Sequence, residues 1–122
     1  MILNLTQHPA TAEQKAQGVI DLSETLHKQP VSLLTFDEIP SDAEMGQRAL
    51  DILAIAALHW PEIRQVMLGG APFFMPSLDT TFSMSGYECL YAFSRRESVE
   101  EVMADGTVRK TAVFRHLGFV RT

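Results

Sequence analysis

The sequence is poor in cysteine, in long hydrophobic runs and in positive charge, and each shortage narrows the classes of protein to consider. Cys89 is the only cysteine among 122 residues, so the chain predicts no intramolecular disulfide and no cysteine-based zinc site. The longest apolar run, around residues 52–58, is far shorter than a membrane span. The formal net charge of −5 argues against a duplex nucleic-acid partner, which needs a continuous basic face.

Targeting and metal-binding patterns are also missing. No amino-terminal segment has the basic, apolar and small-residue layout of a signal peptide, so we expect a cytoplasmic protein with no membrane partner. The histidines do not have metal-ligand spacing, and no nucleophile elbow is present, so we expect neither a metal nor another cofactor. An apolar content of 46% and a charged content of 20% are ordinary for a globular protein. The length then predicts one domain over residues 1–122.

The segment that organises the chain is Arg64–Met75. Val66–Leu68 is an apolar run too short for a helix, and Gly69 and Gly70 follow it directly. This is the pattern of a strand that turns into a helix, where free helix amides can face an anion. An ordinary turn between a strand and a helix gives the same pattern.

Alternating strand-like and helix-like segments surround this turn. The patterns predict strands over residues 1–6, 19–22, 31–35, 66–68 and 87–93, helices over 11–18, 41–60 and 76–85, and a turn or helical turn over 23–29. Thr11 with Gln14, and Ser41 with Glu44, fit capping boxes. Asp105-Gly106 predicts a tight primed turn between strands 98–104 and 107–114. We therefore expect an α/β fold, namely a Rossmann-like open sheet that is parallel at its centre, with helices on both faces and a C-terminal antiparallel hairpin.

The predicted helix over residues 41–60 is apolar on nearly every side from Ala49 to Leu58. Such a helix needs more than one covering partner. We therefore expect a homodimer whose interface comes from this helix or from the terminal hairpin.

Polar residues follow three of the predicted parallel strands. If these strands are neighbours, the loops after them share the carboxyl edge of the sheet, where open α/β sheets bind ligands. The residues concerned are Thr6, Gln7 and His8, then Gly69, Gly70 and Ala71, then Ser94, Arg95 and Arg96. Arginines and helix amides hold phosphates, so these residues favour cleavage of a ribonucleotide phosphodiester in which the ribose hydroxyl is the nucleophile.

Each of these residues also has a structural interpretation. His8 can be an ordinary exposed loop histidine, and Arg95 and Arg96 can be solvated charges that pair with the nearby glutamates. Cys89, within an apolar strand, is interpreted as a core residue. His59, Trp60 and His116 are also interpreted as structural residues.

The chain resembles the single-domain CRISPR-associated Rossmann-fold (CARF-like) proteins that begin with an N-L-S-N-H-P type motif. The resemblance rests on Asn4–Pro9, the glycine turn after Val66, Ser94-x-Arg96, Val99-Glu100, Asp105-Gly106, Lys110 and Phe114. One departure is Ala71–Phe74, which stands where an acidic and aromatic run is expected. Members of this group bind cyclic oligoadenylate as dimers, and the ring nucleases among them cut it without a metal.

The resemblance implies a homodimeric protein of antiviral defence that binds a small cyclic oligonucleotide and cleaves it. It implies that His8, Ser94 and Arg96 are catalytic and that Thr6, Gln7, Gly69, Gly70, Ala71 and Arg95 bind the ligand. Two alternatives are a non-catalytic nucleotide sensor with the same site and a partner-binding protein from a mobile genetic element.

Overall fold

A computed structural model describes the whole chain, residues 1–122. In chain order the elements are β1 (Ile2–Leu5), α1 (Ala12–Ala16), β2 (Val19–Ile20), α2 (Glu24–Leu34), α3 (Asp42–His59), β3 (Gln65–Leu68), α4 (Met75–Met84), β4 (Glu88–Val102) and β5 (Val108–Arg121). None of the helices combines the length and the apolar composition that a membrane-spanning helix needs.

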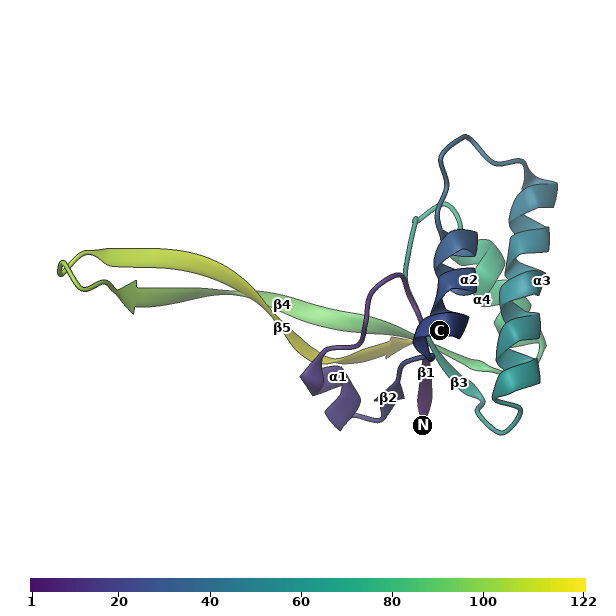
Figure 1. Cartoon of the computed structure of the whole chain (residues 1–122), viewed down its shortest axis with the longest axis horizontal. Coiled ribbons are helices and arrows are strands. Elements are labelled where there is room, and N and C mark those ends of the chain that lie inside the picture. Colours follow the sequence, from purple (N-terminus) through teal and green to yellow (C-terminus); the bar gives the residue numbers. More distant parts are fainter.

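The five strands form one sheet in the order β2-β1-β3-β4-β5 (Figure 1). The first four strands are parallel neighbours, and β5 pairs with β4 in the antiparallel direction. Helices α2, α3 and α4 cover one face, and the short α1 lies against β2 and β5 on the other. The predicted α/β fold, parallel at its centre with a C-terminal hairpin, is confirmed.

Alternating residues of the central strands feed two separate cores. Leu3, Leu5, Val66 and Leu68 belong to the larger core, beneath α2, α3 and α4. The residues between them, such as Ile2 and Met67, belong to a small core on the α1 face. Because side chains alternate along a strand, β1 and β3 are buried on both faces and fix the position of the loops that follow them.

The predicted helix starts are largely correct. Thr11 accepts a hydrogen bond from the Gln14 amide while the Gln14 side chain accepts one from the Thr11 amide, which completes the predicted capping box. Ser41 likewise caps α3 by accepting from the Glu44 amide. The Glu44 carboxylate, however, pairs with Arg48 at 3.1 Å, so only the Ser41 half of the second box is present.

The predicted strand over residues 31–35 is wrong, because these residues end helix α2. Ser23 caps this helix, and the whole segment 24–34 is helical with Pro30 inside it. Leu26, Pro30 and Leu34 are spaced four residues apart, and all three face inward. This helical spacing, together with the Ser23 cap, outweighs the local strand tendency of Val31 and the missing amide of Pro30.

The hairpin is much longer than predicted. Residues 88–102 form one continuous strand, so the expected break after Phe93 is only a register shift between Phe93 and Ser94. Beyond Leu90, the last residue of β4 that pairs with β3, the two strands leave the body of the protein as a twisted ribbon (Figure 1). We call residues 94–117 the arm.

The turn at the tip of the arm also differs from the predicted primed turn. Within this turn only Gly106 has a positive φ, 84°, whereas the predicted primed turn needs a positive φ at both Asp105 and Gly106. The Gly106 amide donates to the Met103 carbonyl at 2.9 Å, and the Met103 amide donates to Thr107 at 2.8 Å. A turn over Ala104 and Asp105 followed by left-handed Gly106 therefore closes the hairpin, which is the usual three-residue solution.

Candidate functional site

The strand order contains one topological switch point, between β1 and β3. From β1 the chain passes to β2 on one side and then returns to β3 on the other side. In open α/β sheets, ligands bind in the crevice outside the carboxyl ends of the strands at such a point. Thr6–His8 follow β1 and Gly69–Ala71 follow β3, so two of the three predicted loops lie at this switch point.

The buried Asn4 side chain holds the loop after β1 in place. Its amide nitrogen donates to the His8 carbonyl at 2.9 Å and to the Asp21 carboxylate at 2.8 Å. Its oxygen accepts from the Thr6 amide at 3.0 Å and from the Thr6 hydroxyl at 2.7 Å. With only 1% of Asn4 exposed, these bonds fix the backbone on both sides of Gln7 while the His8 side chain stays exposed.

Asp21, just after β2, completes this network. Its Oδ1 accepts from Asn4 and from the Ala10 amide at 2.9 Å, and Lys15 lies 3.7 Å from its other oxygen. Partial burial raises the pKa of Asp21, but the hydrogen bonds from Asn4 and Ala10 outweigh burial and leave the pKa below its ordinary value. An ionised Asp21 therefore ties the strand β2 to the loop after β1.

The two loops touch each other at Gly69. A Cβ atom added to Gly69 would lie 3.1 Å from Thr6 Cγ2, closer than side chains normally pack. The missing Cβ of Gly69 therefore lets the backbone after β3 approach the loop after β1. Gly70 has a φ of 153° and is exposed, and Ala71 begins the turn that leads into α4.

An aromatic hollow adjoins this pair of loops. Gln7 reaches the segment after α2, where its amide nitrogen lies 3.1 Å from the Thr35 hydroxyl. The next residue, Phe36, packs edge-on against Phe73 and Phe74 with ring centroids 5.1 Å apart in both pairs. These neighbours open a hollow of about 460 Å³, which we call the aromatic hollow; it is lined by Phe36, Asp37, Glu38, Ile39, Pro40, Met45 and Phe73.

A second cavity, of about 620 Å³, lies where β3 and β4 meet α4. Its Asp79 carboxylate accepts hydrogen bonds from Tyr91 at 2.8 Å, Thr122 at 2.5 Å and Ser83 at 3.0 Å. Burial raises the pKa of Asp79, but these three hydroxyls outweigh burial and leave the pKa below its ordinary value. Burial, with the adjacent Asp79, raises the pKa of Tyr91. Asp79 is thus occupied in joining α4 to β4 and the chain end.

The structural role of Asp79 in joining α4 to β4 can be tested through the pH dependence of stability. The carboxylate has a lower pKa in the folded state than its ordinary value of 3.8, so its contribution is present above that value and is lost as the pH falls through the folded pKa. Asp79→Asn is expected to reduce the loss of stability between about pH 5 and pH 2. Urea unfolding across this pH range measures the effect, with Asp51→Asn at an exposed position of α3 as the control. Equal acid sensitivity of Asp79→Asn and wild type would refute the role of the Asp79 carboxylate in joining α4 to β4.

Cys89 lies in the core, as the sequence predicted. Its side chain is buried beside Ser83, with the Cys89 Sγ and Ser83 Oγ atoms 3.6 Å apart. Burial raises the pKa of the Cys89 thiol, which disfavours the thiolate that a nucleophile needs.

The third predicted loop does not exist. Ser94, Arg95 and Arg96 lie within β4 at the root of the arm, where they pair with His116, Arg115 and Phe114. They are on the carboxyl side of the sheet, as expected, but the continuing strand carries them away from the switch point. The expectation that they form a loop beside His8 within one chain is therefore wrong.

The two arginines differ in their contacts. Arg95 pairs with Glu97 at 3.0 Å, which agrees with the structural interpretation, whereas Arg96 forms no ion pair. His116 is buried and lies 2.9 Å from the Gln17 side chain, so it joins the arm to α1. This contact confirms the structural role predicted for His116.

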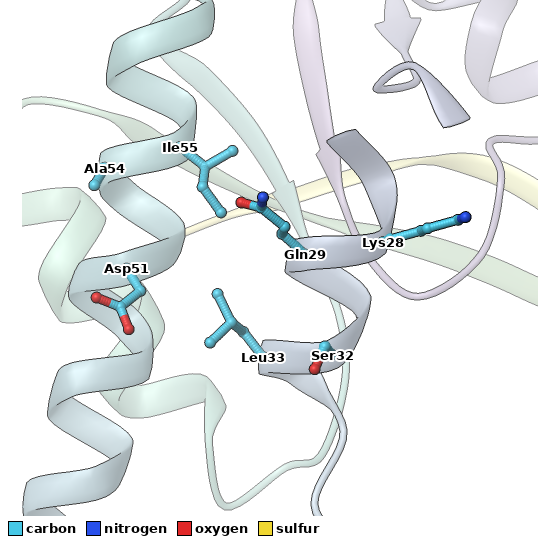
Figure 2. Close-up of a pocket in the computed structure, with 7 residues that line it drawn as sticks. All are labelled: Lys28, Gln29, Ser32, Leu33, Asp51, Ala54 and Ile55. Atoms are coloured by element: carbon cyan, nitrogen blue, oxygen red, sulfur yellow. The ribbon is translucent and has the colours of Figure 1, made fainter. Parts of the chain in front are cut away.

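A further groove, between α2 and α3, offers no such convergence of chemistry. It has a volume of about 510 Å³ and is lined by Lys28, Gln29, Ser32, Leu33, Asp51, Ala54 and Ile55. Leu33 and Ile55 point toward each other across it, and Lys28 points away from α3 (Figure 2). Nowhere in the chain do three His, Cys, Asp or Glu side chains gather in a way that could hold a metal ion.

Sequence reasoning found both loops of the switch point and missed the residues that hold them. Asn4 had one signal, because it is the polar residue in the strand I-L-N-L. Asp21, Phe36 and Asp79 had none, since their partners lie far away in the sequence.

A protein-family model described as "Uncharacterized protein MJ1673 family" matches residues 1–120. No curated protein and no solved structure matches the chain.

Proposed function

The chain thus belongs to the MJ1673 family, and we propose that it binds a cyclic oligoadenylate at the β1/β3 switch point and, in its catalytic form, cleaves it without a metal. The observation that carries the proposal is the direct contact between the loops of Thr6–His8 and Gly69–Ala71 at this point of the sheet. The resemblance of these same loops to the CARF-like proteins supplies the ligand class.

The residues at the switch point suit a ribose-phosphate ring. Gly70 is exposed, so a phosphate can approach its backbone closely, and Thr6 and Gln7 offer hydrogen-bonding groups. In the catalytic form, the ribose 2′-oxygen attacks the adjacent phosphorus and the bond to the 5′-oxygen breaks. The 2′-hydroxyl proton leaves to a base and another proton reaches the 5′-oxygen, which yields a 2′,3′-cyclic phosphate and a free 5′-hydroxyl. His8, exposed on the fixed loop, is suited to move one of these protons.

One observation favours the non-catalytic sensor as a second candidate. Of the three residues predicted to be catalytic, only His8 lies at the switch point within one chain, while Ser94 and Arg96 lie on the arm. A site that keeps its binding loops but lacks part of its proton-transfer machinery would bind the ring without opening it.

Incubation of the protein with cyclic tetra-adenylate separates these candidates. Chromatographic resolution of linear products, together with calorimetric titration, gives three outcomes. Product formation in the presence of a chelator supports the ring nuclease, and binding without product supports the sensor. If the protein neither binds the ring nor forms product, the proposal is contradicted and a partner-binding protein is favoured.

Arg96 provides a quantitative test of the ligand class. Because Arg96 has no ion-pair partner in the chain, its guanidinium is free to contact a phosphate. Arg96→Ala is expected to weaken binding of cyclic tetra-adenylate by about 2 kcal/mol, the size of a charge-assisted phosphate contact, with a nearly unchanged melting temperature. Arg109→Ala, an exposed arginine near the arm tip, is the matched control. Equal affinities of the two variants would contradict a phosphate contact for Arg96.

A further inference from the structure

The arm is too exposed to be explained by the single chain. It extends away from α2, α3 and α4 and does not pack against them (Figure 1). A two-stranded ribbon is marginally stable alone in water, and yet this one carries exposed apolar side chains, among them Val99, Val102, Val108 and Phe114. Phe114 is the largest of these and is 75% exposed. These features indicate a surface that another molecule covers.

Charge identifies the kind of molecule. The arm holds five of the ten lysines and arginines and four of the fifteen acidic residues, so its net charge is +1. The remainder of the chain holds five basic and eleven acidic residues, which gives −6. The arm of one copy is therefore attracted to the body of another copy, while two bodies repel each other.

The body offers a complementary surface in the aromatic hollow. Ile39 is 98% exposed and Phe73 is 52% exposed, although both are large and apolar. Asp37 and Glu38 add two negative charges to the same lining. An apolar hollow with an acidic lining fits an aromatic side chain that is flanked by cations.

The arm presents such a group on one of its faces. Arg96 pairs directly across the ribbon with Phe114, so both side chains point to the same side. Val113, next to Phe114 in sequence, points to the opposite side.

We propose that the arm of one copy docks onto the body of a second copy, with Phe114 in the partner's aromatic hollow and Arg96 beside the partner's switch point. The hollow and the switch point adjoin through Gln7 and Thr35, so an arm in the hollow brings Arg96 to the loops of Thr6 and Gly69. Two-fold symmetry makes the exchange reciprocal. The role of Arg96 in this arrangement rests on the proposed function, whereas the docking of Phe114 does not.

Cysteine cross-linking tests the contact without any ligand. Mixing equal amounts of Ile39→Cys and Phe114→Cys under mild oxidation is expected to give a disulfide-linked dimer in about half of the protein, the share that assembles as heterodimers. Mixing Ile39→Cys with Val113→Cys should give no more than the wild-type chain, whose only thiol is the buried Cys89. Equal linkage by residues 113 and 114, or by neither, would overturn the docking.

Sedimentation equilibrium tests its contribution to assembly. Phe114→Ala is expected to raise the dimer dissociation constant at least tenfold, and Val113→Ala less than twofold. Reversal of both acidic groups, by Asp37→Lys with Glu38→Lys, should also weaken the dimer. A wild-type monomer at micromolar concentration would overturn the inference. The inference would also be overturned if Leu58→Lys, at an exposed position of α3, dissociates the dimer while Phe114→Ala does not.

Complementation tests whether the site is shared between copies. A mixture of the His8→Ala and Arg96→Ala chains contains heterodimers in which one site has His8 from one chain and Arg96 from the other. If Arg96 acts in the partner's site, the mixture is expected to recover about a quarter of the wild-type turnover. If the mixture recovers no function while the disulfide between residues 39 and 114 still forms, then Arg96 does not act in the partner's site, but the arm still docks as proposed. If the wild-type protein binds no cyclic tetra-adenylate, the proposed function is refuted. The cross-linking experiment would still test whether the arm docks, because it needs no ligand.

Discussion

Replacing Asn4 by leucine is expected to lower the free energy of unfolding by about 3 kcal/mol, the largest stability effect of any polar side chain in this fold. Leucine has the same number of side-chain heavy atoms and the same branching as asparagine, so the substitution removes the polar groups with little change in side-chain shape. The Thr6 amide loses its hydrogen-bond partner in or near the core, and the His8 carbonyl and Asp21 Oδ1 each lose one of their two donors. Each buried group left without a partner costs roughly 1–3 kcal/mol, and rearrangement of the exposed part of the loop recovers some of this cost.

Urea unfolding of the Asn4 variant measures this effect. Gln65→Leu is the matched control, because Gln65 is a half-buried strand amide whose side chain makes a single hydrogen bond, to Glu88 at 3.2 Å. The control is expected to cost less than about 1 kcal/mol. Amide exchange should also accelerate at Thr6 in the Asn4 variant, because the loop loses its anchor. If the two variants lose equal stability, then Asn4 is not the anchor of the loop.

The sequence predicted those elements whose signals are local. The strand Val66–Leu68 before two glycines and the cap at Thr11 each depend on residues close in the sequence, and both are found in the structure. Asp105-Gly106 correctly placed the hairpin turn, although the turn is not of the primed type. Helix α2 was missed because Pro30 and Val31 disfavour a helix locally. The burial of Leu34 against distant elements decides its structure instead.

The candidate site also has one part that the sequence could predict and one part that it could not. The loops after β1 and β3 could be placed together because parallel neighbours end at one edge. The arginines could not be placed, because a charged ribbon of alternating residues has the composition of a loop when no core covers it. Cross-strand pairs such as Arg96 with Phe114 and Glu97 with Val113 keep residues 94–102 extended, and these pairs depend on a strand more than ten residues away.

Replacing His8 by alanine is expected to slow cleavage of cyclic tetra-adenylate by 10²-fold or more, while the affinity changes less than about threefold, if the protein acts as a ring nuclease. General acid–base groups typically contribute 10²–10⁴-fold to the rate, and the effect appears in turnover when the group acts only in the transition state. The His8 backbone carbonyl accepts from Asn4 at 2.9 Å and from the Thr6 hydroxyl at 3.0 Å, so loss of the imidazole should leave the loop in place.

Single-turnover kinetics and calorimetry on the same samples separate rate from affinity in this experiment. His59→Ala is the matched control, since His59 is also exposed but ends α3, on the side of the sheet where β3 begins. Its turnover should equal that of the wild type. A His8 variant that loses affinity and turnover by the same factor would make His8 a binding residue, and one that retains full turnover would show that the proton is moved by another group. In either case His8 would not be the acid or base.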